Sequence, residues 1–145
     1  MSKPILRHAD SAGEIAQCYA LMRELRPHLR SEVEFVERVQ RQRSAGYFLL
    51  TAALDDRIVG LAGYRAQENL IYGHFIYVDD LVVDPDARRG GIGAQLLDGV
   101  VEECRRQAVP TLVLDTAIGN SLGQRFYFRY GMLARGLRFS MPVTL

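Results

Sequence analysis

The sequence predicts a mixed β-sheet with helices on its faces, at the border between the α/β and α+β fold classes. Two observations predict this class. Short apolar runs of β-forming residues alternate with longer segments whose apolar residues recur at helical spacing. Their order along the chain is strand, two helices, three strands, helix, strand, helix and strand. With 145 residues the chain has the size of a single domain, so residues 1–145 are expected to form one domain.

The first half of the chain begins with a short strand and a capped helix. Residues 5–8 are expected to form the strand. A helix is expected at residues 12–26, because Asp10 or Ser11 can cap it and Glu14 can serve as the capping-box partner.

Pro27 ends this helix, and Ser31 can cap a second one. The second helix is marked by three valines at helical spacing, Val33, Val36 and Val39. Residues 47–54 and 57–66 are apolar runs on either side of an Asp-Asp turn, which predicts a β-hairpin.

The second half of the chain continues with a longer strand that ends at Asp84-Pro85, because proline cannot donate to a β-ladder. An amphipathic helix starts near Ile92, and Gly131 closes a later helix. The elements expected here are strands at 71–83, 111–116 and 133–143 and helices at 92–104 and 120–130.

Charge and cysteine content exclude several classes of partner. The chain has 18 basic and 17 acidic residues, so its net charge of +1 indicates neither a nucleic-acid nor a membrane partner. Cys18 and Cys104 fall in helical patterns, where free thiols behave as small buried hydrophobes. The first residues lack the apolar core of a signal peptide, so a soluble, reduced, cytoplasmic protein is expected.

A glycine-rich turn with two arginines lies between a strand and a helix. Backbone N–H groups at a helix N-terminus favour an anion, and glycines let the backbone approach it closely. Arginines at the same place suit a phosphate. The turn contains Arg88, Arg89, Gly90, Gly91 and Gly93.

Two common phosphate-binding motifs do not match this turn. A P-loop requires a lysine after the glycines, and none is present. The dinucleotide-binding Rossmann fingerprint fits better, because Asp115 ends the next apolar strand, roughly where a ribose-binding acid would lie. However, Leu96 occupies the third glycine position, and the loop before the glycines is too long for the tight turn.

The arrangement Arg88-x-x-Gly91-x-Gly93 resembles the pyrophosphate loop of the GNAT superfamily, the acyl-CoA-dependent N-acyltransferases. A second segment, NSLGQRFYFRYGM, resembles the second motif of that family, with Gly123 in place of alanine and Met132 in place of phenylalanine. The segment IYVDDLVVDPDARRGGIG is similar to that of the spermidine/spermine N-acetyltransferases and of many short bacterial members.

The resemblance implies a mostly antiparallel sheet of six to seven strands with about four helices on its faces. It also implies acetyl-CoA as co-substrate, with backbone groups near Leu81 and Val83 pairing with the pantetheine arm. The residues expected to hold the cofactor are Leu81, Val83, Arg88, Arg89, Gly90, Gly91, Gly93, Ala94 and Asn120.

Two adjacent carboxylates, Asp79 and Asp80, interrupt an otherwise apolar strand. Most of an alkyl amine is protonated at neutral pH, so a carboxylate that removes its proton directly or through water would assist attack. Neighbouring strand residues point to opposite faces unless a bulge re-aims them, and the resemblance implies such a bulge here. Asp79 aligns with the catalytic glutamate of the polyamine enzymes. Both aspartates therefore remain candidates, with Asp79 first.

The thiolate leaving group needs a proton donor, and the resemblance assigns that role to Tyr127. Asn120 can cap the helix that carries this tyrosine, and the cap alone would explain the asparagine. No cluster of metal-ligating residues is visible, so no metal is expected.

The amine acceptor is expected at the segment that joins the first two helices. Arg26, His28 and Arg30 give this segment a basic excess that suits an acceptor with a carboxylate or phosphate. Asp79 and Asp80 would instead attract a polyamine, so spermidine remains the alternative.

The predicted activity is acetyl transfer to a primary amine of a small molecule, amino acid or peptide by direct attack through a tetrahedral intermediate. The main alternative is a CoA-binding regulatory domain without turnover, and a nicotinamide-binding domain is a more distant one. A homodimer is expected, because a terminal strand at 137–143 could pair across a two-fold axis.

Overall fold

Five strands form one mixed sheet in the order β1-β2-β3-β4-β5. Neighbouring strands are antiparallel except β4 and β5, which run parallel. The strands are β1 (Ile5–His8), β2 (Tyr47–Leu54), β3 (Arg57–Asn69), β4 (Gly73–Val83) and β5 (Leu112–Leu114). The computed structural model describes residues 3–145 and divides after Leu114 into two units, of which the first contains this sheet.

The hairpin of β2 and β3 turns through Asp55 and Asp56, as the sequence predicts. Their φ angles of 49° and 63° are the left-handed values that a tight two-residue hairpin turn requires, and aspartate tolerates them better than most residues. The register places Leu54 opposite Arg57, so the hairpin closes directly at this turn.

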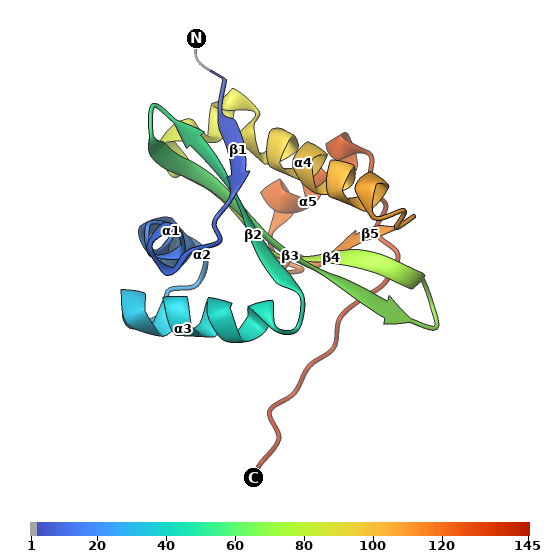
Figure 1. The fold of residues 1–145 in the computed structure, drawn as a ribbon. Coiled ribbons are helices and arrows are strands. Elements are labelled where there is room, and N and C mark those ends of the chain that lie inside the picture. Colours follow the sequence, from blue (N-terminus) through green and yellow to red (C-terminus); the bar gives the residue numbers. More distant parts are fainter. Residues whose placement is uncertain (1–2) are drawn as a thin grey trace. The chain divides into compact units, whose positions relative to one another are not determined.

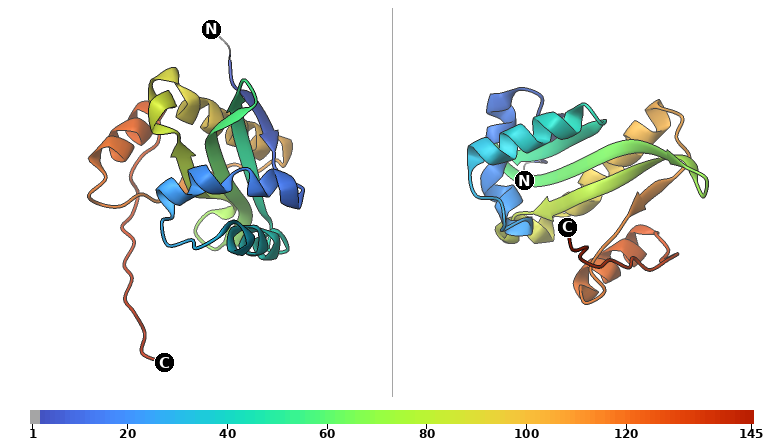
Figure 2. Two further views of the ribbon diagram at one scale, coloured as in Figure 1. Left: turned by 90° about the vertical axis from the view of Figure 1, so that its left-hand side faces the viewer. Right: turned by 90° about the horizontal axis from the view of Figure 1, so that it is seen from below.

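Three helices cover one face of the sheet (Figures 1 and 2). They are α1 (Ala12–Ala16), α2 (Tyr19–Leu25) and α3 (Glu32–Arg43). Ser11 and Glu14 form the predicted capping box at α1, which lowers the pKa of Glu14 to about 2, and Ser31 caps α3. Buried side chains of these helices, of the connections between them and of β2, β3 and β4 form the core on this face: Ile15, Cys18, Leu21, Met22, Leu29, Phe35, Val39, Tyr47, Leu49, Leu61 and Val82.

The helix predicted at residues 12–26 is divided into α1 and α2. The backbone N–H of Cys18 bonds to the carbonyl of Ile15, three residues back, and its thiol donates to the carbonyl of Glu14. This tighter turn interrupts the α-helical pattern.

Helix α4 (Ile92–Arg106) covers the opposite face of the sheet (Figure 1). Its apolar side is buried, as the predicted amphipathic pattern requires: Ile92, Leu96, Leu97, Val100 and Cys104. Gly60 of β3 permits this close packing, because a Cβ there would lie 2.8 Å from side-chain atoms of both Ile92 and Leu96.

The second unit, residues 115–145, contains α5 (Ser121–Tyr130). Asn120 caps this helix and Gly131, with a φ of 108°, ends it, both as predicted. The prediction of a strand at 133–143 is wrong, because this segment pairs with no strand in the described residues. The described sheet therefore has five strands instead of six to seven.

The number of helices also exceeds the four expected. The described chain has five α-helices because the first predicted helix is divided, and a short 3₁₀ helix, η1 (Pro85–Gly90), precedes α4. Within residues 3–145, no helix is long and apolar enough to cross a membrane.

Candidate functional site

A β-bulge in β4 is centred on Asp79. Gly63 of β3 pairs with Asp80, whereas the next residue, Tyr64, pairs with Val78. Asp79 is therefore the extra residue on its strand and stands opposite no residue of β3. The bulge that the family resemblance implies at this position is confirmed.

The bulge directs both carboxylates to the face covered by α1–α3. Asp80 lies two residues before Val82, which belongs to the core on that face. Asp79 pairs with Arg65, whose guanidinium lies over the ring of Tyr47, another residue of the same core. Without the extra residue, adjacent side chains would point to opposite faces.

Asp79 is held by a two-pronged ion pair with Arg65. Arg65 Nε lies 3.0 Å from Asp79 Oδ1, and Nη2 lies 2.9 Å from Oδ2. The same Nη2 donates to Gln42 Oε1 of α3 at 2.6 Å. Burial raises the pKa of Asp79, although Arg65 opposes the shift.

Asp80 has two different partners. Arg26 Nε donates to its Oδ1 at 2.8 Å, and the hydroxyl of Tyr47 donates to its Oδ2 at 2.8 Å. Burial and the adjacent Asp80 carboxylate raise the pKa of Tyr47 well above its usual value. The phenol therefore stays protonated and remains a donor to Asp80.

The two carboxylates and two guanidinium groups form one connected and electrically neutral network, which we call the bulge network: Arg26, Gln42, Tyr47, Arg65, Asp79 and Asp80. Sequence reasoning identified its aspartates and Arg26 but missed the other three members. One signal in the sequence could have pointed to this network: Gly63 lies within a strand, and such glycines mark places where neighbouring atoms approach the backbone closely.

Gly63 provides the space that Tyr47 occupies. An ideal Cβ on Gly63 would lie 1.8 Å from the Tyr47 hydroxyl oxygen, closer than any real contact. Only glycine at this position lets the phenol reach Asp80 in the observed geometry.

The predicted acceptor residues have different environments. Arg26 is engaged with Asp80 and with the backbone carbonyl of Asp79, so its charge is already neutralised. His28 and Arg30 are exposed in the connection between α2 and α3. The basic excess predicted for this segment therefore resides in His28, Arg30 and the neighbouring exposed Arg23.

Beyond the bulge, β4 continues past the end of its parallel neighbour. Pairing between β4 and β5 ends at Val78 and Leu114, whereas pairing with β3 continues to Val83. Leu81 and Val83 lie in this last part of β4 and are half-buried. The β5 side of this segment is a strand edge at which an extended ligand could add as a further strand.

The glycine-rich turn joins this strand edge to α4. Gly91 has a φ of 71° and precedes α4, whose N-terminus has no side-chain cap. Arg88 and Arg89 are exposed in η1, and Gly90 is also exposed. The first turn of α4 contains Gly93 and Ala94. Exposed guanidinium groups and uncapped N–H donors provide the chemistry of an anion site.

Helix α5 of the second unit carries the predicted acid and cap residues. Burial raises the pKa of Tyr127, so its hydroxyl stays protonated at neutral pH. Asn120 Oδ1 accepts from the backbone N–H of Gly123 at 3.0 Å, and its Nδ2 donates to Thr116 at 3.0 Å. A Cβ on Gly123 would lie 2.5 Å from Asn120 Nδ2, so an alanine there would require the asparagine side chain to shift.

The sequence matches the family model described as Acetyltransferase (GNAT) family over residues 15–132. The chain belongs to the GNAT family. An uncharacterized N-acetyltransferase, YhdJ, of Bacillus subtilis is 25% identical to it over 140 residues, which cover 95% of this chain and 98% of the relative. An aminoalkylphosphonate N-acetyltransferase of Salmonella typhimurium is 30% identical over 142 residues, covering 93% and 88%.

The fold agrees with solved GNAT structures. A Trypanosoma brucei acetyltransferase superposes with a TM-score of 0.79 at 23% identity, covering 97% of this chain and 99% of that one. The predicted mixed α/β GNAT fold is thus confirmed. The general reaction of the family is acetyl transfer to an amine.

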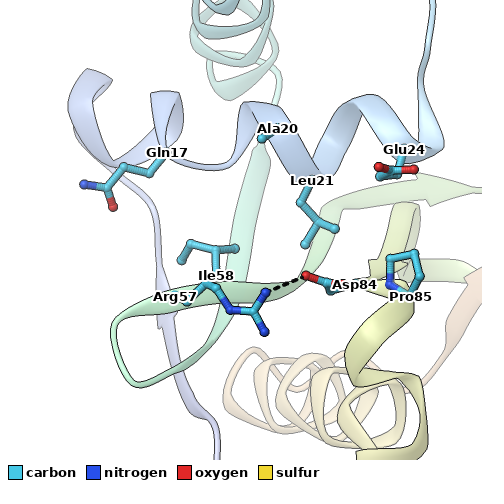
Figure 3. Close-up of a pocket in the computed structure, with 8 residues that line it drawn as sticks. All are labelled: Gln17, Ala20, Leu21, Glu24, Arg57, Ile58, Asp84 and Pro85. Carbon is cyan, nitrogen blue, oxygen red and sulfur yellow. Dashed lines mark hydrogen bonds and ion pairs between the residues drawn. The ribbon is translucent and has the colours of Figure 1, made fainter.

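A cleft of about 360 Å³ lies beside the C-terminal end of β4 in this GNAT chain. Figure 3 shows Leu21 of α2 above Arg57 and Asp84, which form an ion pair with a distance of 3.1 Å. The cleft is lined by Gln17, Ala20, Leu21, Glu24, Arg57, Ile58, Asp84 and Pro85, none of which is a predicted site residue. Among the described residues, no group of three or more histidine, cysteine, aspartate or glutamate side chains is arranged to hold a metal ion.

Proposed function

We propose that the chain transfers an acetyl group from acetyl-CoA to a primary amine. The observation that carries this proposal is the bulge in β4, which aims Asp79 and Asp80 to one face at the point where pairing with β5 ends. In the transfer, the amine nitrogen forms a bond to the thioester carbonyl carbon, the C–S bond breaks, and the sulfur takes up a proton.

Three features of the chain support binding of the CoA ester. The β5 side of the segment around Leu81 and Val83 offers backbone groups to an extended arm. The uncapped N-terminus of α4 and the exposed side chains of Arg88 and Arg89 suit the pyrophosphate. The positive φ of Gly91 favours glycine, and the missing side chain lets a ligand approach the backbone of this turn closely.

Asp79 is the better candidate for the group that accepts the amine proton. An alkyl ammonium has a pKa of about 10.4, so only roughly one molecule in a thousand is nucleophilic at neutral pH. Burial raises the pKa of Asp79 and makes it a stronger base than an ordinary aspartate. The Asp79 side chain is 24% exposed, against 15% for Asp80, so it is also the more accessible to an amine or a bridging water.

Tyr127 is the proposed proton donor to the leaving sulfur. Its raised pKa keeps the hydroxyl protonated at neutral pH, as a general acid requires. Tyr127→Phe would remove this proton without removing the ring.

We propose an acceptor that carries an anionic group besides its amine. The bulge network is neutral, so it offers no surplus negative charge to a polyamine. The exposed guanidinium of Arg30 offers positive charge instead, and His28 beside it is also exposed. The relative from Salmonella typhimurium is named for acceptors of this kind, aminoalkylphosphonates.

The test compares kcat/KM for an aminoalkylphosphonate, an amino acid and spermidine in the wild-type chain and in Arg30→Ala. Arg41→Ala is the matched control, because Arg41 is also exposed but lies on α3. We expect a preference for the anionic acceptors that Arg30→Ala reduces and Arg41→Ala leaves intact. Faster turnover of spermidine, unaffected by either substitution, would instead favour the polyamine alternative.

The paired state of both aspartates favours a second candidate, a CoA-binding domain without turnover. In such a domain, the ion pairs with Arg26 and Arg65 would be purely structural. It would bind acetyl-CoA but release no CoA with any amine.

We also propose a homodimer formed by exchange of the C-terminal segment 133–145. In an extended conformation one face of this segment would carry Leu133, Leu137, Phe139, Met141, Val143 and Leu145, each 70% exposed or more. β5 is the last strand of the described sheet, yet its three residues are apolar and half-buried. The C-terminal segment of one copy could therefore pair as a strand with β5 of the other copy, and the same pairing would occur twice across a two-fold axis.

The buried, free thiols of Cys18 and Cys104 support action in the reducing cytoplasm. Burial raises the pKa of Cys18 to about 12, so its thiol is inert there.

A further inference from the structure

We infer that Arg26 is a positioning residue that holds the bulge of β4, and with it Asp79, against the connection between α2 and α3. This inference rests on the proposed function of Asp79. It assigns Arg26 to the catalytic strand and not to the acceptor, where the sequence pattern had placed it.

Arg26 makes two contacts with adjacent residues of the bulge. Its Nε donates to Asp80 Oδ1 at 2.8 Å, and its Nη2 donates to the backbone carbonyl oxygen of Asp79 at 2.8 Å. One guanidinium group thus binds the side chain of one residue and the main chain of its neighbour. This fork fixes the orientation of the peptide between Asp79 and Asp80.

The contact to the Asp79 carbonyl compensates for the irregular pairing of the strand. The extra residue of a bulge stands outside the regular ladder, and Asp79 stands opposite no residue of β3. A half-buried carbonyl without a partner is unfavourable, so a donor from outside the sheet stabilises the bulged conformation. Arg26 supplies that donor.

The main chain of Arg26 is itself anchored. It ends α2, and its N–H bonds to the carbonyl of Met22 at 2.8 Å. Its carbonyl accepts from the N–H of Leu29 at 3.1 Å, and Tyr19 donates to the carbonyl of Leu29 at 3.2 Å. Leu29 is buried, so the connection that carries Arg26 is fixed to the core.

The connection between α2 and α3, which is joined to the bulge through Arg26, couples two parts of the proposed site. His28 and Arg30 lie in this connection, within four residues of Arg26. An acceptor that binds to them therefore acts on a segment whose position determines the orientation of Asp79. The charged and titratable groups around the Arg26 guanidinium are Asp79, Asp80, Arg65 and Tyr47.

The experiment measures amide hydrogen exchange by NMR in the wild-type chain, Arg26→Ala and Arg41→Ala, without any substrate. We expect exchange at residues 79–81 to accelerate at least tenfold in Arg26→Ala, while the β2–β3 hairpin keeps its wild-type rates. Arg41→Ala should match the wild type throughout. Arg26→Gln, which retains a donor of shorter reach, should give an intermediate effect and serves if the alanine variant does not fold.

Kinetics then separates positioning from general stability. In Arg26→Ala, we expect kcat to fall about tenfold while KM for acetyl-CoA changes less than twofold, and the acid limb of the pH profile to move. If residues 79–81 exchange at wild-type rates in both Arg26→Ala and Arg26→Gln, the inference is overturned. Because exchange is measured without substrate, it tests the role of Arg26 even if no acetyl transfer is found, a result that would count against the proposed function alone.

Discussion

The Tyr47 hydroxyl donates to Asp80 Oδ2 at 2.8 Å, in space that exists only because residue 63 is glycine. On the face covered by α1–α3, the Tyr47 side chain passes across Gly63 of β3 and reaches β4. A position on β2 therefore determines the environment of a carboxylate two strands away.

Gly63→Ala should displace the Tyr47 hydroxyl from Asp80. Overpacking of this kind costs about 1–3 kcal/mol, and the bond to a charged group is lost as well. Gly13→Ala is the control, because a Cβ there meets nothing within 4 Å and alanine favours the helix. Urea denaturation should show a lower free energy of unfolding for Gly63→Ala only. If the free energy of unfolding of Gly63→Ala equalled that of the wild type, Tyr47 would move aside without cost.

The pH dependence of kcat/KM should reveal the raised pKa of Asp79. A base must be ionised to act, so activity should fall as the pH decreases through a midpoint above 3.8, the ordinary value. Asp79→Asn should lower kcat/KM by about 10²–10⁴-fold and remove this limb. An acid limb that persists in Asp79→Asn would place the base elsewhere.

Much of this arrangement follows from sequence patterns that act locally. The capping box at Ser11, the Asp55-Asp56 turn and the amphipathic face of α4 depend on residues a few positions apart, and all three are confirmed. The bulge at Asp79 was expected only through the family resemblance. No local pattern specified it.

Other features depend on register or on tertiary partners and could not be predicted. The bulge network includes Tyr47, Gln42 and Arg65 only because β2, α3 and β3 meet β4 at this point. The break at Cys18 has no glycine or proline to mark it. The apolar alternation at 133–143 indicates a strand, but a strand forms only where a partner strand is available.

The glycine-rich turn can be tested by the pair Gly91→Asp and Gly91→Asn. Both residues have similar size and tolerate the left-handed conformation, so their difference isolates the negative charge. We expect Kd for acetyl-CoA, measured by calorimetry, to rise at least tenfold more in Gly91→Asp. Equal affinities of the two variants would show that the phosphates bind elsewhere.

The proposed homodimer can be tested on two adjacent residues of the C-terminal segment. Phe139→Asp places a charge on the apolar face, whereas Ser140→Asp places the same charge on the other face. Sedimentation at micromolar concentration should show dimers for the wild type and Ser140→Asp and monomers for Phe139→Asp. A monomeric wild type would refute the exchange.

The most direct test of the whole account is the release of CoA from acetyl-CoA, followed together with the mass of the amine. The wild-type chain should release CoA with at least one amine of a panel containing aminoalkylphosphonates, amino acids, peptides and spermidine, and that amine should gain one acetyl group. Tyr127→Phe should lower this rate, whereas Tyr72→Phe, at the remote end of the β3–β4 hairpin, should not. Binding of acetyl-CoA with no CoA release above the uncatalysed rate for any amine would contradict the account and favour the CoA-binding domain without turnover.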